Sequence, residues 1–462
     1  MKLKTIHFTF FTSIILLLLL GIYYRDFSSF ITFLLFQYLG ILFFKKQLEI
    51  VKKLQKISFF INVSSAVIIT LCFQSLNGTW YSLGQDDFAF YNIADQLSRG
   101  AQVFSIDKEH FEWGAIQYKL YVFVFAYWFK ILNIIGIKSN FFFHLNIINS
   151  FVGSFIAPFV YKIGLKLFKD TITPKKAAVF CLLFPTIIYY SSVIIRDSWI
   201  ISIFLVIVYL VISDKNLLKK LIPIFILLLC VFYLRKSSAV FITFFILLYS
   251  AFNTNNVYIV FFINRVVPVV VLAILILFFV AIQLPAPKVA PPTTDILDYI
   301  SYTVNFYREL STEEAAQNSL GLRLRLSNNP IILFVYYIYF YLSPIPPLFM
   351  NKFNLITLFL GVGNLFWYLL SPLYFIHTFQ LKKNADKRVF IKTFFWFLIL
   401  VLIMVGTATG EQRHLLFIYP IVILISVDYI LNHKNQFYNY MLVFLIISLI
   451  STLLYLIVKM IL

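Results

Sequence analysis

The sequence has few charged residues for its length. Only 12% of its 462 residues are charged, and 61% are hydrophobic, whereas an ordinary soluble domain has ~25% charged residues. A soluble protein of this size could not bury so much apolar surface, because monomers rarely expose large apolar patches. The composition therefore excludes a cytosolic enzyme and a disordered protein.

Cysteine is also scarce. The three cysteines, Cys72, Cys181 and Cys230, all lie inside apolar runs. We therefore expect neither a disulfide framework nor a zinc site, and a secreted disulfide scaffold is excluded.

Long apolar runs, by contrast, recur from end to end and predict an all-α polytopic membrane protein, with residues 1–462 as a single integral-membrane domain. The basic start is followed by an apolar stretch without a small-residue cleavage site, so we expect a retained first helix. The predicted spans, about 13, are 6–24, 27–44, 57–76, 141–165, 177–194, 198–213, 221–235, 237–252, 257–282, 354–378, 389–409, 415–432 and 437–461.

Lysine clusters between the spans predict the orientation. The positive-inside rule places them in the cytoplasm. For the same reason the net charge of +19 does not indicate a nucleic-acid partner. The clusters are residues 45–56, 161–176, 214–220 and 380–388.

This orientation holds only if two further apolar stretches, 116–136 and 330–343, do not carry the chain from one side of the membrane to the other. Both are rich in tyrosine, so we expect helices lying along the outer interface. They fall within the two long external loops, 77–140 and 283–353. Eight of the ten arginines then lie outside or at outer helix ends, and arginine offers a planar fork suited to phosphate.

An acidic pair begins the first external loop. Phe90, Ile93 and Leu97 follow at helical spacing, which predicts a short amphipathic helix that starts near Asp87. One interpretation is a general base at the membrane surface, formed by Asp86 and Asp87. The alternative is that one carboxylate caps the helix.

Further clusters of charged residues, called corners below, lie on the same predicted outer face of the membrane. Two arginines in the second loop, Arg323 and Arg325, could grip a lipid phosphate or a sugar acid. Each corner has the alternative interpretation of a helix cap or a headgroup anchor, but several corners on one face favour a site. The other residues of these corners are Arg196 with Asp197, Arg235 with Lys236, and Glu411 with Arg413 and His414.

The first loop also contains Asp107, Glu109 and His110. These side chains offer oxygen and nitrogen ligands to a divalent cation, and a solvated loop is the alternative interpretation. The chain contains no Walker loop, dinucleotide-binding glycine-rich turn or zinc-protease signature, so we expect any group donor to be a lipid.

Taken together, these motifs resemble the GT-C superfamily of integral-membrane glycosyltransferases. The nearest branch is that of the protein O-mannosyltransferases and lipid A aminoarabinose transferases, with related membrane proteins of bacterial surface-polysaccharide clusters. The likeness is carried by the acidic pair, the interfacial stretch 117–136, the run 149–168, the stretch 184–191 with Arg196-Asp197, and Arg413-His414 with Pro420.

The resemblance implies an inverting transferase that uses a polyprenyl-phosphate-linked sugar. It implies Asp86 as the base with Asp87 as its neighbour, and basic side chains that hold the departing lipid phosphate. The phosphate ligands that it indicates are Arg196, Arg235, Arg413 and His414. Lys236, Arg323, Arg325 and Glu411 are further candidates for lipid or sugar contacts.

The chain departs from the family pattern in three ways. The second residue of the acidic pair is often Glu in the family and is Asp87 here. The acidic loop follows the third span rather than the first, so residues 1–56 are interpreted as extra N-terminal helices. No large soluble C-terminal domain is predicted.

Two other functions remain open. A polysaccharide repeat-unit polymerase or ligase would depend on Arg323 and Arg325 more than on Asp86. A flippase or transporter would favour ionisable residues deep in the spans, where Arg265 and Asp428 are the closest examples. We expect a bacterial cytoplasmic (inner) membrane, membrane lipids, and a lipid-linked glycan or glycolipid acceptor.

Overall fold

The computed structural model describes residues 3–81, 86–100, 119–168, 170–213, 217–253, 330–342, 355–380, 385–408 and 412–461. Throughout these ranges the regular structure is helical, without a strand. This confirms the all-α class. The chain divides into two compact units. The first comprises Met1–Thr243, Met350–Gly363 and Tyr419–Leu431, and the second Phe244–Phe349, Asn364–Ile418 and Asn432–Leu462.

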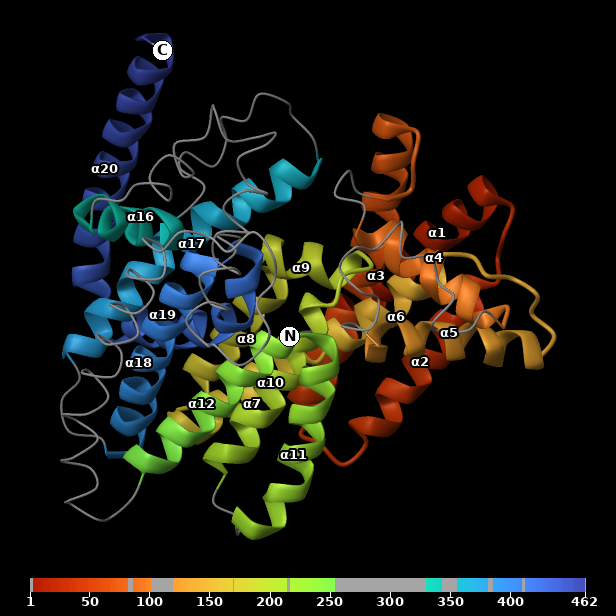
Figure 1. Ribbon diagram of the computed structural model, residues 1–462, viewed down its shortest axis with the longest axis horizontal. Helices are drawn as coiled ribbons and strands as arrows, with labels where there is room; N and C mark the ends of the chain where they lie inside the picture. Colours follow the sequence, from red (N-terminus) through yellow and green to blue (C-terminus); the bar gives the residue numbers. More distant parts are fainter. Residues whose placement is uncertain are drawn as a thin grey trace, which may run out of the picture. The chain divides into compact units, whose positions relative to one another are not determined.

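The first unit contains most of the helices (Figure 1). In chain order the helices are α1 (Leu3–Tyr24), α2 (Ser29–Phe43), α3 (Glu49–Asn77), α4 (Asp86–Ser98), α5 (Lys119–Ile134), α6 (Phe143–Gly153), α7 (Ile156–Leu167), α8 (Ile172–Leu183), α9 (Pro185–Ser192), α10 (Asp197–Ile212) and α11 (Leu217–Leu234), with α19 (Tyr419–Asn432) from late in the chain.

The second unit has its own core of aromatic side chains. Phe245 and Phe397 lie 5.3 Å apart between ring centroids, and the Trp367 indole donates to the Tyr341 carbonyl at 2.7 Å. Its helices are α16 (Pro330–Leu342), α18 (Ala385–Ala408), η4 (Gln412–Ile418) and α20 (Lys434–Ile461), together with most of α12 (Lys236–Phe252) and α17 (Leu355–Gln380).

Five described helical segments are long and apolar enough to cross a membrane, and a sixth is added if the bent pair α8–α9 counts as one span. They are Thr5–Tyr24, Glu49–Asn77, Phe143–Leu167, Lys387–Gly406 and Arg413–Asn432. Several shorter apolar helices accompany them. The structure thus supports a membrane-embedded helical protein, while the predicted number of 13 spans stays a prediction.

Twelve of the 13 predicted spans coincide with described helices, and 257–282 lies outside the described residues. The two stretches predicted to lie along the interface are also helical, as α5 and α16. Two details differ from the prediction. Helix α3 begins at Glu49 rather than near residue 57, and its first turns carry exposed ion pairs of Glu49 with Lys52 and Lys53 at 3.9 and 3.7 Å.

The second difference concerns the predicted span 177–194, which is broken. Helices α8 and α9 meet at an angle of 56°. The break lies at Phe184, which has an extended conformation, and Pro185 begins α9. Proline lacks the N–H that a continuous helix would need and disfavours a helical conformation in the preceding residue, so the sequence itself explains the break.

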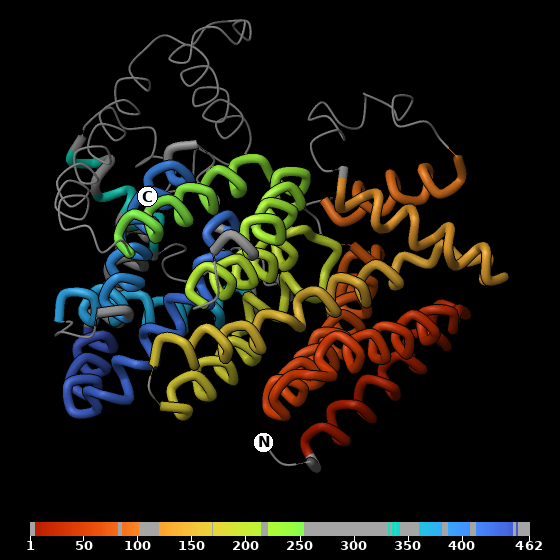
Figure 2. Tube along the Cα trace, turned by 90° about the horizontal axis from the view of Figure 1, so that it is seen from below, coloured from red at the N-terminus to blue at the C-terminus, as the bar shows by residue number. Residues whose placement is uncertain are grey.

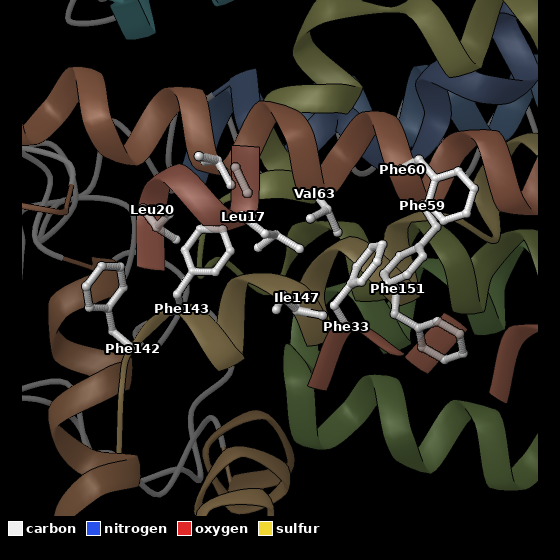
Figure 3. Close-up of a cluster of buried hydrophobic side chains, with 12 residues drawn as sticks. Leu17, Leu20, Phe33, Phe59, Phe60, Val63, Phe142, Phe143, Ile147 and Phe151 are labelled. Carbon is white, nitrogen blue, oxygen red and sulfur yellow. The ribbon is translucent and has the colours of Figure 1, made fainter. Parts of the chain in front are cut away.

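A cluster of buried apolar side chains joins α1, α2, α3 and α6 (Figure 3). At its centre Phe33 stacks on Phe59 with ring centroids 5.5 Å apart, and Phe151 meets Phe59 edge-on. Helix α1 packs along α3, and α4 packs along α5 (Figure 2). Offset and edge-on aromatic pairs are favourable beyond their buried area, so this cluster fixes the N-terminal helices against α6.

Helices α6 and α9 approach closely at Gly153. A methyl group at this position would lie 2.5 Å from Ser191 Cβ, so an alanine there would force the two helices apart. We expect Gly153→Ala to destabilise the protein by about 1–3 kcal/mol, measured as a lower midpoint of thermal unfolding in detergent. The double variant Gly153→Ala with Ser191→Gly should recover most of the loss. An unchanged midpoint in Gly153→Ala would contradict the close approach.

Candidate functional site

Helix α4 begins with the acidic pair. Asp86 is its first residue and is half-buried, whereas Asp87 is only 3% exposed. The Phe88 backbone N–H donates to Asp87 Oδ1 at 3.1 Å. Negative side chains in the first turn are stabilised by the positive end of the helix dipole. The helix predicted to start near Asp87 is therefore confirmed, and it presents both carboxylates at its N-terminal end.

A chain of aromatic rings connects α4 with α5 and α10. Phe90 of α4 meets Tyr121 of α5 edge-on at 5.0 Å between ring centroids, and Tyr121 meets Trp199 of α10 at 5.4 Å. Tyr121 is fully buried. These contacts bring the start of α10 next to the start of α4, although more than a hundred residues separate them in sequence.

Charged groups of both signs act on the buried Tyr121 hydroxyl. Burial raises its pKa well above the ordinary value, the negative charges of Asp197 and Asp87 raise it further, and the positive charge of Arg196 opposes them. All three charged groups therefore act on one buried hydroxyl. Asp87, and Arg196 with Asp197, come from separate charged clusters of the sequence, and the structure adds Tyr121.

Arg196 precedes α10 and lies over α4. Its guanidinium carbon is 5.9 Å from the centre of the Phe90 ring. A guanidinium near an aromatic face within about 6 Å is attracted by the ring quadrupole. This contact holds the positive charge beside the helix that carries the acidic pair.

Arg235, which the resemblance implies as a phosphate ligand, forms an ion pair within the protein. It lies between α11 and α12, and its Nη2 is 2.9 Å from Asp197 Oδ1. The side chains of Arg235 and Asp197 are only 10% and 3% exposed. This buried ion pair joins the end of α11 to the start of α10.

Two asparagines of α6 hold the chain that leads to Arg196. Asn149 Nδ2 donates to the carbonyls of Tyr190 and Val193, and Asn146 Nδ2 donates to the Ser192 carbonyl at 2.9 Å. These carbonyls lie at the end of α9, where a helix leaves its last C=O groups without partners. The asparagines therefore cap α9 and fix residues 193–196.

Asn149 also accepts two hydrogen bonds. Its Oδ1 receives the Trp199 indole N–H at 2.8 Å and the Tyr121 hydroxyl at 3.2 Å. One side chain thus orients α5, α9 and α10 at the site. Its place in the middle of an apolar run gave no signal of this role.

On the other side of α4, a polar network holds the chain between α5 and α6. Asn140 Nδ2 donates to Asp95 of α4, and Tyr91 donates to the Asn140 carbonyl at 3.0 Å. The adjacent Ser139 donates to Asp26 Oδ2 at 2.6 Å. Asp26, in the turn between α1 and α2, thereby helps to anchor α4.

The Asp26 carboxyl has a lowered pKa. Burial alone would raise it, but hydrogen bonds from Ser139 and Ser28 and the charge of His144 lower it further than burial raises it. A carboxyl whose pKa is lower in the folded state stabilises that state above its unfolded pKa. This stabilisation is lost as the pH falls below about 4.

We therefore expect Asp26→Asn to unfold at a lower temperature than the wild type at pH 7, with the difference shrinking as the pH falls below about 4. Thermal unfolding in detergent across pH 7 to 3 measures both. A difference that is independent of pH would show that the charge of Asp26 plays no part.

The remaining predicted residues are one on α12, two in η4 and six outside the described residues. Lys236 is exposed at the start of α12, with its Nζ 5.8 Å from the Phe232 ring. Arg413 and His414 lie in η4, within the second unit, and both are half-buried. The predicted candidates Asp107, Glu109, His110, Arg323, Arg325 and Glu411 lie outside the described residues.

Within the described ranges no group of three or more His, Cys, Asp or Glu side chains is arranged to hold a metal ion. The predicted cation ligands lie outside the described residues, so a cation site in the first loop stays a prediction.

Comparison with known proteins gives no match: no family model, no curated protein and no solved structure is significantly similar to this chain.

Proposed function

We propose that this protein is a membrane glycosyltransferase. It moves a sugar from a polyprenyl-phosphate-linked donor to a lipid-linked glycan or glycolipid at the external face of a bacterial membrane. The observation that carries the proposal is the meeting of Arg196 with the helix that bears the acidic pair: its guanidinium carbon lies 5.9 Å from the Phe90 ring of α4, and α4 begins with Asp86 and Asp87. Carboxylates beside a guanidinium in a membrane-embedded helical protein suit the transfer of a group from a lipid phosphate.

The proposed reaction assigns the base to Asp86. Of the acidic pair, Asp86 is the more exposed and is better able to reach an acceptor from the membrane surface. Its carboxylate takes the proton of the acceptor hydroxyl as that oxygen attacks the anomeric carbon of the donor sugar. The bond from this carbon to the phosphate oxygen breaks, and the configuration inverts. General bases contribute about 10²- to 10⁴-fold to such reactions.

Arg196 is assigned to the departing phosphate. Negative charge grows on the phosphate oxygen as the bond breaks, and a fixed guanidinium stabilises it. The contact with Phe90 and the capped end of α9 support this assignment because they restrict where the guanidinium can lie. A preorganised cation need not reorganise during the reaction.

The identity of the lipid that is released tests the proposal. The purified full-length protein would be mixed with undecaprenyl-phosphate-linked hexoses and a lipid-linked glycan, and the lipids analysed by mass spectrometry. Release of undecaprenyl phosphate with growth of the acceptor is expected. Release of undecaprenyl diphosphate from a diphosphate-linked repeat unit would identify a polymerase instead, and a lipid moved between leaflets with every bond intact would identify a flippase.

A further inference from the structure

The ion pair between Arg235 and Asp197 has one close contact, whereas a bidentate arginine–carboxylate pair has two. Arg235 Nη2 contacts Asp197 Oδ1 at 2.9 Å. The other two atoms that could complete a two-bond fork, Arg235 Nε and Asp197 Oδ2, are buried and have no hydrogen-bond partner among the described residues. Since Nε–H and Nη2–H point from the same edge of the guanidinium, a carboxylate commonly engages both.

Buried polar atoms without partners are costly. Leaving a buried donor or acceptor unsatisfied costs about 1–3 kcal/mol, and more for charged groups. Here the two atoms belong to side chains that are 10% and 3% exposed. The next residue, Ser198, adds a third such atom, because its Oγ is buried and also without a partner in the described part of the chain. Three unmet hydrogen-bonding atoms at the start of α10 favour a polar group from a ligand.

A hydroxyl has the right chemistry for this fork. Its oxygen can accept from Nε–H while its proton goes to Oδ2, so one O–H group completes both bonds. A phosphate is less suitable, because the pair carries no net charge and the carboxylate repels an anion. The pairing of Arg235 with Asp197 thus favours a neutral, hydroxyl-rich ligand over the phosphate that the sequence predicts for Arg235.

We propose that Asp197 and Arg235 form a subsite that binds a hydroxyl of the donor sugar. The inference rests on the proposed function and deepens it. Asp197 directly follows Arg196, which is assigned to the donor phosphate, and the sugar hydroxyls of such a donor lie within a few bonds of that phosphate. The buried rings of Tyr121 and Trp199, fixed by Asn149, hold the start of α10 in place. Asp197 and Arg235 are therefore the residues that select the sugar.

Binding of lipids with and without a sugar tests this subsite. Full-length protein in lipid nanodiscs would be titrated with undecaprenyl phosphate and with its glucose, mannose and N-acetylglucosamine derivatives. The wild type is expected to bind at least one sugar-bearing lipid about ten-fold more tightly than undecaprenyl phosphate. Asp197→Asn should reduce this preference and leave the affinity for undecaprenyl phosphate unchanged.

Because Asp197→Asn leaves the buried Arg235 charge without its partner, that variant could fail to fold. The double variant Asp197→Leu with Arg235→Met replaces the pair with apolar side chains of similar volume, a change that is often neutral for stability. It should bind all four lipids with equal affinity. Glu49→Gln removes an exposed carboxylate, 69% exposed in its ion pairs, and should behave as the wild type.

The outcomes distinguish failure of the subsite from failure of the proposed function. A double variant that keeps the wild-type preference for the sugar-bearing lipid would overturn the subsite and leave the proposed transferase standing. A wild type that binds undecaprenyl phosphate but shows no preference for any sugar would also overturn the subsite. A wild type that binds none of the four lipids would overturn the proposed function, and the subsite with it.

Discussion

Asp86→Asn is expected to lower the rate of sugar transfer by about 10²- to 10⁴-fold, the usual contribution of a general base. Asparagine has nearly the same shape as aspartate but cannot take a proton from the acceptor. A carboxylate in the first turn contributes about 0.3–1 kcal/mol to its helix, so the thermal midpoint should change little. Initial rates of undecaprenyl phosphate release from a saturating donor measure the effect.

Two variants control this experiment. Asp86→Glu keeps a carboxylate one methylene further out and should retain part of the rate. Asp87→Asn tests the neighbouring carboxylate, which is 3% exposed and accepts the Phe88 N–H, so it should affect stability more than Asp86→Asn does. If Asp86→Asn reacts at the wild-type rate, Asp86 only stabilises the helix start, and the base lies elsewhere.

Asn149→Leu is expected to have the largest effect on stability. The leucine would leave the carbonyls of Tyr190 and Val193 without their donor, and the Tyr121 hydroxyl and Trp199 indole without their acceptor. Each buried group left unsatisfied costs about 1–3 kcal/mol, so the total loss is on the order of 5 kcal/mol. We expect little monodisperse protein by fluorescence-detected size-exclusion chromatography.

The neighbouring residue provides a matched control. Ser150 is equally buried on α6, and its Oγ has no hydrogen-bond partner within the described ranges, so Ser150→Ala should elute and unfold like the wild type. Asn149→Asp keeps the acceptor for Tyr121 and Trp199 but removes the donor to the α9 carbonyls, so an intermediate loss is expected. A stable Asn149→Leu variant would show that the capped end of α9 does not depend on this residue.

Much of the fold could be predicted because helix formation in an apolar chain is local. The spacing of Phe90, Ile93 and Leu97 predicted α4, and these three residues are buried. Pro185 explains the break in the predicted span 177–194, yet the prediction ran through it, because hydropathy averages over a window and ignores a single residue. The start of α3 was missed for a related reason: Lys52 and Lys53 lower the local hydropathy, which shortens a predicted span but does not end a helix.

The candidate site was predicted in part. Asp87 and Arg196 could be selected because charged residues stand out in an apolar sequence. Tyr121 could not, because it is one of many aromatic residues in a stretch predicted only to lie along the interface. Arg235 could be selected in the same way, but its ion pair with Asp197 could not be predicted.

The sequence by itself determined the helical class, the membrane-embedded character and the positions of nearly all described helices, because these follow from composition and from residues within a few turns of one another. Only the tertiary structure decided which charges meet. Asp197 and Arg235 are separated by two helices, and their pairing depends on how α10 packs against α11. The Asn149 cap likewise joins α6 to α9. Such contacts depend on packing between distant segments, which no local pattern in the sequence encodes.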